Sequence, residues 1–251
     1  MRRALLLATA AAISVACGSQ PATNAAPPKT VTVFAAASLN QVFPTLQTGF
    51  QKDNPGYRLT FNFAGTQTLI TQLQQGASAD LFASADEAHI TQAETLGLLS
   101  GQAKDFARNQ LEIAVAPGNP KHIETLADLA RADVTLVLAG AAVPAGKYAL
   151  QALQKAAVVA KPKSLEVDVE SVLAKVELGE ADAGIVYTTD VKAAGSKVQG
   201  VVIPAAQNVV ATYPAAVLHG APQAAGARAF LAYLLTPAAQ AVLRRYGFAA
   251  P

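Results

Sequence analysis

Cysteine and charge are both scarce in this chain. Its 251 residues include one cysteine, Cys17, and no tryptophan, and 14% of them are charged. A single cysteine excludes an intrachain disulfide. Without Arg2 and Arg3, which lie in a segment that we expect to be removed, 17 basic residues face 17 acidic ones. A neutral chain has no basic face for a nucleic acid and no net charge to steer an anion, so any anion site has to be built locally.

The motifs of the common enzyme classes are also missing. The sequence has no GxSxG elbow, no HExxH, no CxxC pair and no P-loop, which weakens the case for a hydrolase, a metalloenzyme or a nucleotide-binding protein. The three histidines, His89, His122 and His219, lie outside the turns considered below. We expect a binding protein rather than an enzyme, with a secreted hydrolase as the lesser alternative.

The N-terminus has the features of an export signal. Two arginines precede an apolar run over residues 4–15, which is short for a membrane span. The run ends at Ser-Val-Ala-Cys, which resembles a bacterial lipobox with Ser14 at the position usually held by Leu. We expect residues 1–16 to be a signal peptide and residues 17–29 to be a lipidated Cys17 with a flexible linker; an ordinary signal peptide with a chance cysteine is the alternative. The protein would then be extracytoplasmic, either lipid-anchored to the cell membrane or periplasmic.

Beyond residue 30, short apolar β-type runs alternate with longer helical patterns, which predicts an α/β fold with mostly parallel sheets flanked by helices. Strands are expected at residues 30–36, 57–63, 80–84, 111–116, 134–139, 183–187, 201–204 and 215–219. Helices are expected at residues 39–51, 66–75, from about 87, and at 146–157, 170–177, 225–235 and 237–245.

Two extended runs, at residues 111–116 and 207–219, have no helix next to them in this alternation. They predict two crossover segments between two lobes. Lobe 1 would comprise residues 30–112 and 210–251, and lobe 2 residues 113–209.

Four strand-to-helix junctions carry small or hydroxyl residues and no basic residue before the helix begins. They contain Ser38 and Thr66, each expected as a helix N-cap, and then Ala145 and Val169. Ligands of α/β folds lie at such junctions. A helix start offers unpaired N–H groups and a partial positive charge, which suits an anion without any Lys or Arg. Asp168 and Glu170 flank Val169. We expect their negative charges to lie at the N-terminus of the helix and to point away from the site. A carboxylate that pointed into the site would repel an anion.

Several motifs occur together in order along residues 30–248. They are TVFAAASL (32–39), FAGTQTL (63–69), ADLFASAD (79–86), VPAGKYALQAL (143–153), ADAGIVYTTD (181–190) and RRYGF (244–248). In this combination the sequence resembles the molybdate-binding proteins of ABC transporters. The resemblance implies a two-lobed type II periplasmic binding protein fold, a membrane permease as partner, no cofactor, and a monomer.

The resemblance also implies a set of neutral ligands for a tetrahedral oxyanion. Ser38, Thr66 and Tyr187 would donate through their hydroxyls, and Ala145 and Val169 through their backbone N–H groups. The metal would be bound as its oxyanion, with no direct bond from the protein to the metal.

The residue types at these turns favour a fully ionised dianion. Molybdate, tungstate and sulfate carry no proton and need donors only, whereas phosphate carries a proton and benefits from a carboxylate acceptor. A rigid cavity sized for the longer Mo–O bond would leave donors unpaired around sulfate, at about 1–3 kcal/mol for each buried group. The sequence does not separate molybdate from tungstate, and receptors for sulfate, thiosulfate or phosphate remain alternatives.

Overall fold

The computed structural model describes residues 27–251. The predicted signal peptide, Cys17 and most of the predicted linker lie outside the described residues. Within residues 27–251, no helix combines the length and the apolar character that a membrane crossing requires.

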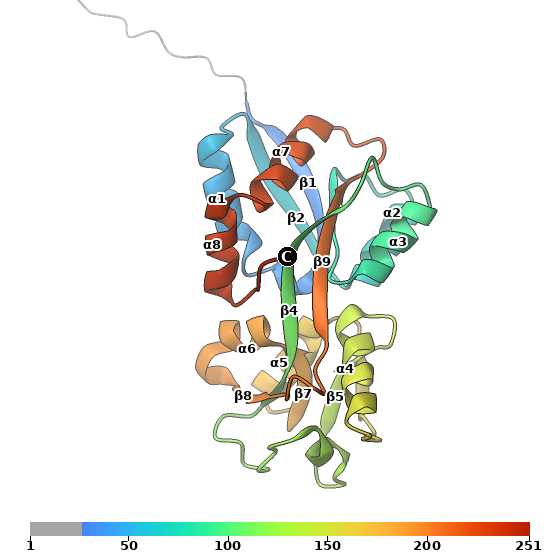
Figure 1. Cartoon of the computed structure of the whole chain (residues 1–251), viewed down its shortest axis with the longest axis vertical. Helices are drawn as coiled ribbons and strands as arrows, with labels where there is room; N and C mark the ends of the chain where they lie inside the picture. The colour runs from blue at the N-terminus through green and yellow to red at the C-terminus, as the bar shows by residue number, and fades with distance from the viewer. Residues whose placement is uncertain (1–26) are drawn as a thin grey trace, which may run out of the picture.

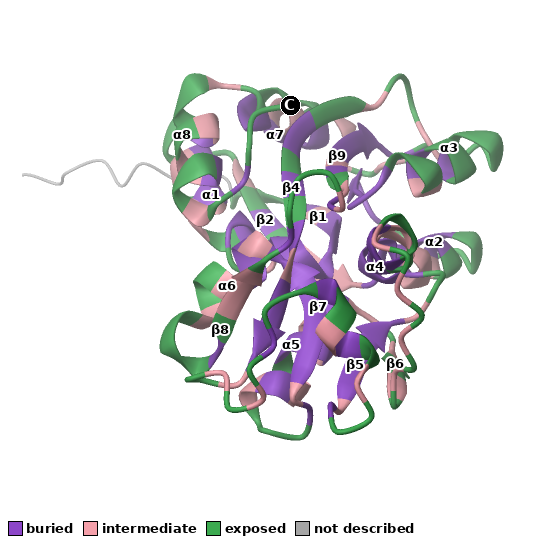
Figure 2. Cartoon of the chain, turned by 60° about the horizontal axis from the view of Figure 1, so that its bottom comes forward, coloured by how far each residue is buried: buried purple, intermediate pink, exposed green. Residues whose placement is uncertain are grey.

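The strands form a mixed sheet in the order β2-β1-β3-β9-β4-β7-β5-β6, and β8 pairs with β4 beside this path. The strands are β1 (Lys29–Ala36), β2 (Tyr57–Ala64), β3 (Leu81–Ala83), β4 (Lys104–Val115), β5 (Leu136–Ala139), β6 (Ser164–Glu166), β7 (Ala183–Tyr187), β8 (Gln199–Val202) and β9 (Val210–Val217). Figure 2 shows the central strands buried, as their apolar sequences require: every residue of β5 and β7 is buried.

Strand β4 joins two groups of elements. Its first part, Lys104–Gln110, pairs with β9, and its second part, Leu111–Val115, pairs with β7. Figure 1 shows β4 and β9 running along the long axis of the molecule, from one group to the other. The first group contains β1, β2 and β3, and the second contains β5, β6, β7 and β8.

Helices cover both groups. Around the first group lie α1 (Phe43–Asp53), α2 (Thr66–Gln74), α3 (Glu87–Thr95), α7 (Ala224–Leu234) and α8 (Pro237–Tyr246) (Figure 1). Around the second lie α4 (Pro144–Lys155), α5 (Val169–Glu177) and α6 (Thr188–Ala194). Three short 3-10 helices complete the set: η1 (Ala37–Leu39), η2 (Leu126–Ala130) and η3 (Gly195–Lys197).

The expectation of mostly parallel sheets is wrong. Strand β1 is parallel to β2 and β3, and β5 is parallel to β6 and β7. Every pairing of β4 or β9 is antiparallel. The reason lies in the chain path: β4 leaves the first group and β9 returns to it alongside, so the two strands run in opposite directions through a sheet whose remaining pairs follow strand–helix–strand connections.

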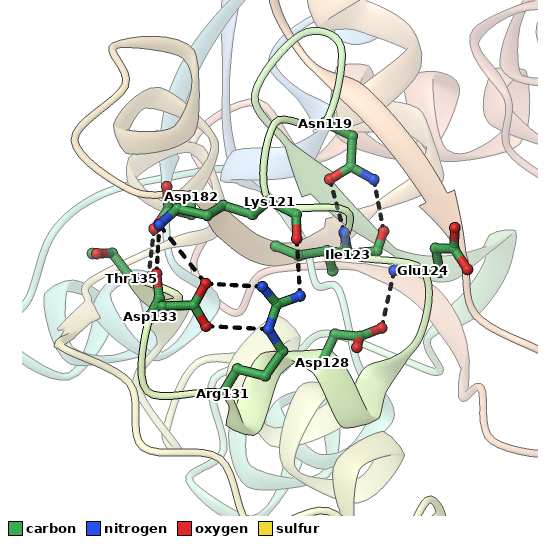
Figure 3. A network of polar contacts seen from close by, with 9 residues as sticks. All are labelled: Asn119, Lys121, Ile123, Glu124, Asp128, Arg131, Asp133, Thr135 and Asp182. Carbon is green, nitrogen blue, oxygen red and sulfur yellow. Dashed lines mark hydrogen bonds and ion pairs between the residues drawn. The ribbon is translucent and has the colours of Figure 1, made fainter.

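The long connection between β4 and β5 is held by polar contacts (Figure 3). The Asn119 side chain accepts from Ile123 N and donates to Ile123 O, both at 2.9 Å. Arg131 donates to Asp133 Oδ2 at 2.9 Å and to Lys121 O at 2.9 Å. These hydrogen bonds tie together the parts of a loop in the second group.

Candidate functional site: a cavity lined by helix starts

A small cavity lies between the two groups, with space for a compact group of atoms and none for an extended organic molecule. All five residues that the sequence suggested as oxyanion ligands line it. The full lining is Ala36, Ala37, Ser38, Gly65, Thr66, Ala85, Val143, Pro144, Ala145, Asp168, Val169 and Tyr187.

The proposed ligand residues all lie at or just after the carboxyl end of a strand. Ser38 follows β1 and Thr66 follows β2, both in the first group. Ala145 follows β5, Val169 follows β6, and Tyr187 is the last residue of β7, all in the second group. The two groups therefore contribute facing halves of one site, at the position where α/β folds place their ligands.

Two details of the predicted caps are wrong. Ser38 lies inside η1, and α1 begins only at Phe43, with Pro44 in its first turn. Thr66 is the first residue of α2, and its N-cap is Gly65, which has no side chain to cap with. At α4 the N-cap is Val143, again without a side-chain hydrogen bond. The first N–H groups of α2 and α4 therefore have no acceptor from a capping side chain. They lie at the helix ends that line the cavity.

The three hydroxyl groups differ in their partners. Ser38 Oγ lies 2.9 Å from Tyr213 Oη. Thr66 Oγ1 accepts a long hydrogen bond of 3.4 Å from Ala85 N, so its own proton is free to be donated. Tyr187 Oη is buried and makes no hydrogen bond of ordinary geometry among the described residues, although the Tyr213 hydroxyl lies near it. An unpartnered buried hydroxyl costs about 1–3 kcal/mol, so a ligand that accepts from it recovers that cost.

The Tyr187 hydroxyl is a neutral donor. Burial raises the pKa of Tyr187 well above its ordinary value, and the neighbouring Tyr213, Tyr148 and Asp190 raise it further. A phenol that stays protonated can donate a hydrogen bond to an anion across the whole physiological range.

Asp168 is the single charged side chain in the lining, where no Lys, Arg or His is present. Its Oδ1 accepts from Ser171 N at 2.8 Å, so the carboxylate caps α5. A cap of this kind places the negative charge on the helix start rather than leaving it free. The hydrogen bond confirms that Asp168 caps α5. The expectation that it stays out of the site is wrong, because Asp168 also lines the cavity.

Glu170 does not line the cavity but a neighbouring hollow, together with Glu177, Asp190 and Lys197. Burial raises the pKa of Glu170 to about 7, although the nearby Asn40 side chain lowers it, and the charges of Asp168 and Glu177 raise it further. Burial likewise raises the pKa of Asp190 well above its ordinary value. Asp190 Oδ2 accepts from Tyr187 N at 2.8 Å, which fixes the backbone that presents the phenol.

Direct contacts join the two groups beside the cavity. Gln67 in the first turn of α2 donates through Nε2 to Val167 O, two residues before α5, at 2.8 Å. A Cβ on Gly65 would lie 2.6 Å from the same carbonyl oxygen. The groups are therefore in contact at the rim, and Gly65 is what lets the backbones approach so closely.

Sequence reasoning missed Tyr213, which contacts Ser38 from β9. Tyr213 lies in the run 207–219, which the sequence predicts only as a crossover segment. No local signal could have linked it to Ser38, because the two residues are 175 positions apart.

Residues 31–249 match the family model described as bacterial extracellular solute-binding protein. The molybdate-binding protein ModA of Mycobacterium tuberculosis is 42% identical, covering 94% of this chain and 93% of that protein. A putative ABC transporter substrate-binding lipoprotein of Bacillus subtilis, YvgL, is 30% identical over 96% of this chain and 95% of its own length.

Among solved structures, the sulfate-binding protein SubI of Mycobacterium tuberculosis superimposes with a TM-score of 0.80 at 19% identity, covering 88% of this chain and 87% of that chain. At this identity the match shows the fold alone. It confirms the α/β periplasmic binding protein fold that the sequence predicted.

Proposed function

Because the chain belongs to the ModA family of bacterial extracellular solute-binding proteins, we propose that it captures molybdate and delivers it to an ABC importer. The role is binding and transport, not catalysis. Tungstate is the ion that this site would accept as an equivalent, since its size and charge are nearly the same.

One observation supports this function most strongly: the cavity is lined by hydroxyls and helix starts, with no basic side chain. Such a lining supplies hydrogen-bond donors and the positive ends of helix dipoles. The one carboxylate of the lining, Asp168, accepts from Ser171 N in the cap of α5. The lining therefore suits an anion that carries no proton. The unpartnered Tyr187 hydroxyl gives the ion one donor that nothing else in the described chain uses.

The proposed ligands are the hydroxyls of Ser38, Thr66 and Tyr187 and the backbone N–H groups of Ala145 and Val169. Three of them come from helix-start residues, Thr66 in α2, Ala145 in α4 and Val169 in α5. These ligands come from both sides of the cavity. The ion would therefore be held by all of them only when the two groups of elements lie close together.

We further propose that the two groups are lobes that close around the ion. Lobe 1 would be residues 30–112 and 210–251, and lobe 2 residues 113–209. Strand β4 pairs with β9 up to Gln110 and with β7 from Leu111 onward, and this exchange of partners supports a boundary at this point. A ligand that contacts both lobes favours the closed form by its differential affinity, and the permease would recognise that form.

The proposed attachment to the membrane is a lipid on Cys17. The Ser-Val-Ala-Cys sequence supports it, as does the description of the similar YvgL as a lipoprotein. We propose an extracytoplasmic monomer held at the membrane by this anchor.

A thermal-shift panel tests the choice of ion. The chain is heated with molybdate, tungstate, sulfate, thiosulfate or phosphate, at matched ionic strength set with sodium chloride. At 1,000 times the dissociation constant, a bound ion adds about 4 kcal/mol of stability. We expect large shifts for molybdate and tungstate only, and a clear reduction of both in Ser38→Ala. A larger shift with sulfate or phosphate would overturn the choice of molybdate while leaving an oxyanion receptor standing.

A further inference from the structure

A chain of buried hydrogen bonds leads away from Ser38 into the crossing strands. Ser38 Oγ contacts Tyr213 Oη at 2.9 Å, and Tyr213 Oη lies 3.5 Å from Asn109 Nδ2. Asn109 Nδ2 also donates to Thr189 Oγ1 at 2.8 Å. All four residues are buried. We call this series of hydrogen bonds the relay. Tyr213 belongs to β9 and Asn109 to β4, so the relay includes both strands that cross between the groups.

The amide of Asn109 has a fixed orientation. Its Oδ1 accepts from Gln110 N at 3.0 Å and from Thr188 Oγ1 at 3.0 Å. Because a backbone N–H can only donate, the atom facing Gln110 must be the amide oxygen. The amide nitrogen then faces Thr189 and Tyr213.

The orientation of Asn109 favours one direction for the hydrogen bonds between Tyr213 and Ser38. An amide nitrogen only donates, so Tyr213 Oη is the acceptor from Asn109. Tyr213 Oη lies near the Tyr187 hydroxyl as well, but the neighbour that accepts its proton at a short distance is Ser38 Oγ at 2.9 Å. Donation to Ser38 keeps the buried Tyr213 proton from being left unpaired. With Ser38 Oγ accepting from Tyr213, the Ser38 proton is left to point into the cavity.

We propose that Tyr213, oriented by Asn109, is a positioning residue that makes Ser38 a donor toward the bound oxyanion. The inference rests on the proposed function, because it assigns a polarity to one of the proposed ligands. Without this arrangement the Ser38 hydroxyl could turn its proton toward Tyr213 and present only lone pairs to a dianion. The relay thus favours a bare oxyanion over a ligand whose own proton needs an acceptor at Ser38.

The test is a double-mutant cycle on molybdate affinity, measured by isothermal titration calorimetry with the whole mature chain. We expect Tyr213→Phe to weaken molybdate binding about 3- to 10-fold, the range of one neutral hydrogen bond. In a Ser38→Ala background the same change should alter the affinity less than twofold, because the group that Tyr213 positions is gone. A merely structural role of Tyr213 would weaken binding equally in both backgrounds.

Tyr246→Phe is the matched control. It also removes a hydrogen-bonded phenol hydroxyl, which contacts Thr45 Oγ1 at 2.6 Å and is not part of the cavity lining. We expect it to leave molybdate affinity unchanged.

A second variant tests the direction of the relay if Tyr213→Phe folds poorly. Asn109→Asp keeps the shape and replaces the donating nitrogen by an accepting oxygen, so Tyr213 would turn its proton away from Ser38. The added charge acts in any background, but the loss through the relay acts only when Ser38 is present. We therefore expect Asn109→Asp to weaken binding at least threefold more with Ser38 than with Ala at that position.

The outcomes separate the two proposals. If the unaltered chain binds no molybdate, the proposed function falls and this inference with it. If it binds normally and Tyr213→Phe changes the affinity less than twofold, or changes it equally in both backgrounds, the inference alone is overturned.

Discussion

At the scale of single residues, the informative feature is a donor without an acceptor. Tyr187 is 1% exposed, and its hydroxyl makes no hydrogen bond of ordinary geometry among the described residues. A folded protein pays for such a group, and it is retained when a ligand uses it. The hydroxyl therefore lowers the stability of the ligand-free chain and raises its affinity for a ligand.

Tyr187→Phe separates those two effects. Removing the unpaired hydroxyl should leave the ligand-free unfolding free energy unchanged or slightly raised. It should weaken molybdate binding about 10- to 100-fold, since hydrogen bonds to charged groups contribute about 1.5–3 kcal/mol. Urea denaturation gives the first quantity and calorimetry the second. A variant that loses stability but keeps its affinity would show that the phenol is a packing residue only.

The placement of the five proposed ligand residues around one cavity could be predicted because each lies within a short motif beside a strand end. That of Tyr213 and Asn109 could not. Asn109 meets Tyr213 across 104 positions and Thr189 across 80, and such meetings depend on strand register, which the local pattern does not set. The unsatisfied state of Tyr187 Oη is likewise a property of the packed site and not of the sequence around it.

At the scale of elements, the start of α4 is fitted tightly to the end of β5. A Cβ on Gly146 would collide with the carbonyl oxygens of Gly140 and Ala139. Only glycine lets the helix begin this close to the strand, and the preceding Ala145 owes the position of its amide to that contact.

Gly146→Ala should therefore act on both folding and binding. We expect a loss of about 1–3 kcal/mol in unfolding free energy from overpacking, together with weaker molybdate binding as the Ala145 amide moves. Gly56→Ala is the control, because a Cβ there would meet no atom within 4 Å. Denaturation and calorimetry on both variants measure the two effects. Equal behaviour of the two variants would contradict the role given to Gly146.

Most strands and helices were predicted close to their observed bounds, because apolar periodicity and glycine or proline boundaries mark them. The helix expected at residues 39–51 begins instead at Phe43, since the turn after β1 is used for η1 and the cavity. The short β6 and α6 were not predicted, because three and seven residues carry too little periodicity. Strand β4 extends to twelve residues, of which the apolar pattern revealed only the second half.

At the scale of the whole molecule, the described conformation has its two groups in contact over the cavity. The hydrogen bond from Gln67 to Val167 O joins them at the rim. If the groups are lobes, this contact belongs to the closed form, and it contributes to the balance between open and closed forms.

Gln67→Ala tests this balance. Loss of one hydrogen bond should shift the ligand-free chain toward an open form and raise its radius of gyration in solution scattering. Molybdate affinity should fall about 3- to 10-fold, and saturating molybdate should restore the compact value. Gln47→Ala is the control, since within residues 27–251 the Gln47 side chain is hydrogen-bonded to Gln51 on the same helix and to no residue of the second group. An unchanged radius of gyration and affinity in Gln67→Ala would exclude the proposed latch.

The absence of a basic side chain from the cavity lining has a consequence for the loaded protein. Residues 27–251 carry 17 basic and 17 acidic side chains, and dipoles that hold an ion cancel none of its charge. Capture of one doubly charged ion therefore turns a nearly neutral particle into one with a net charge of about −2, by the charge count alone. The loaded and empty forms would then differ in electrophoretic mobility. Binding of the ion would change the net charge of the molecule as well as its shape.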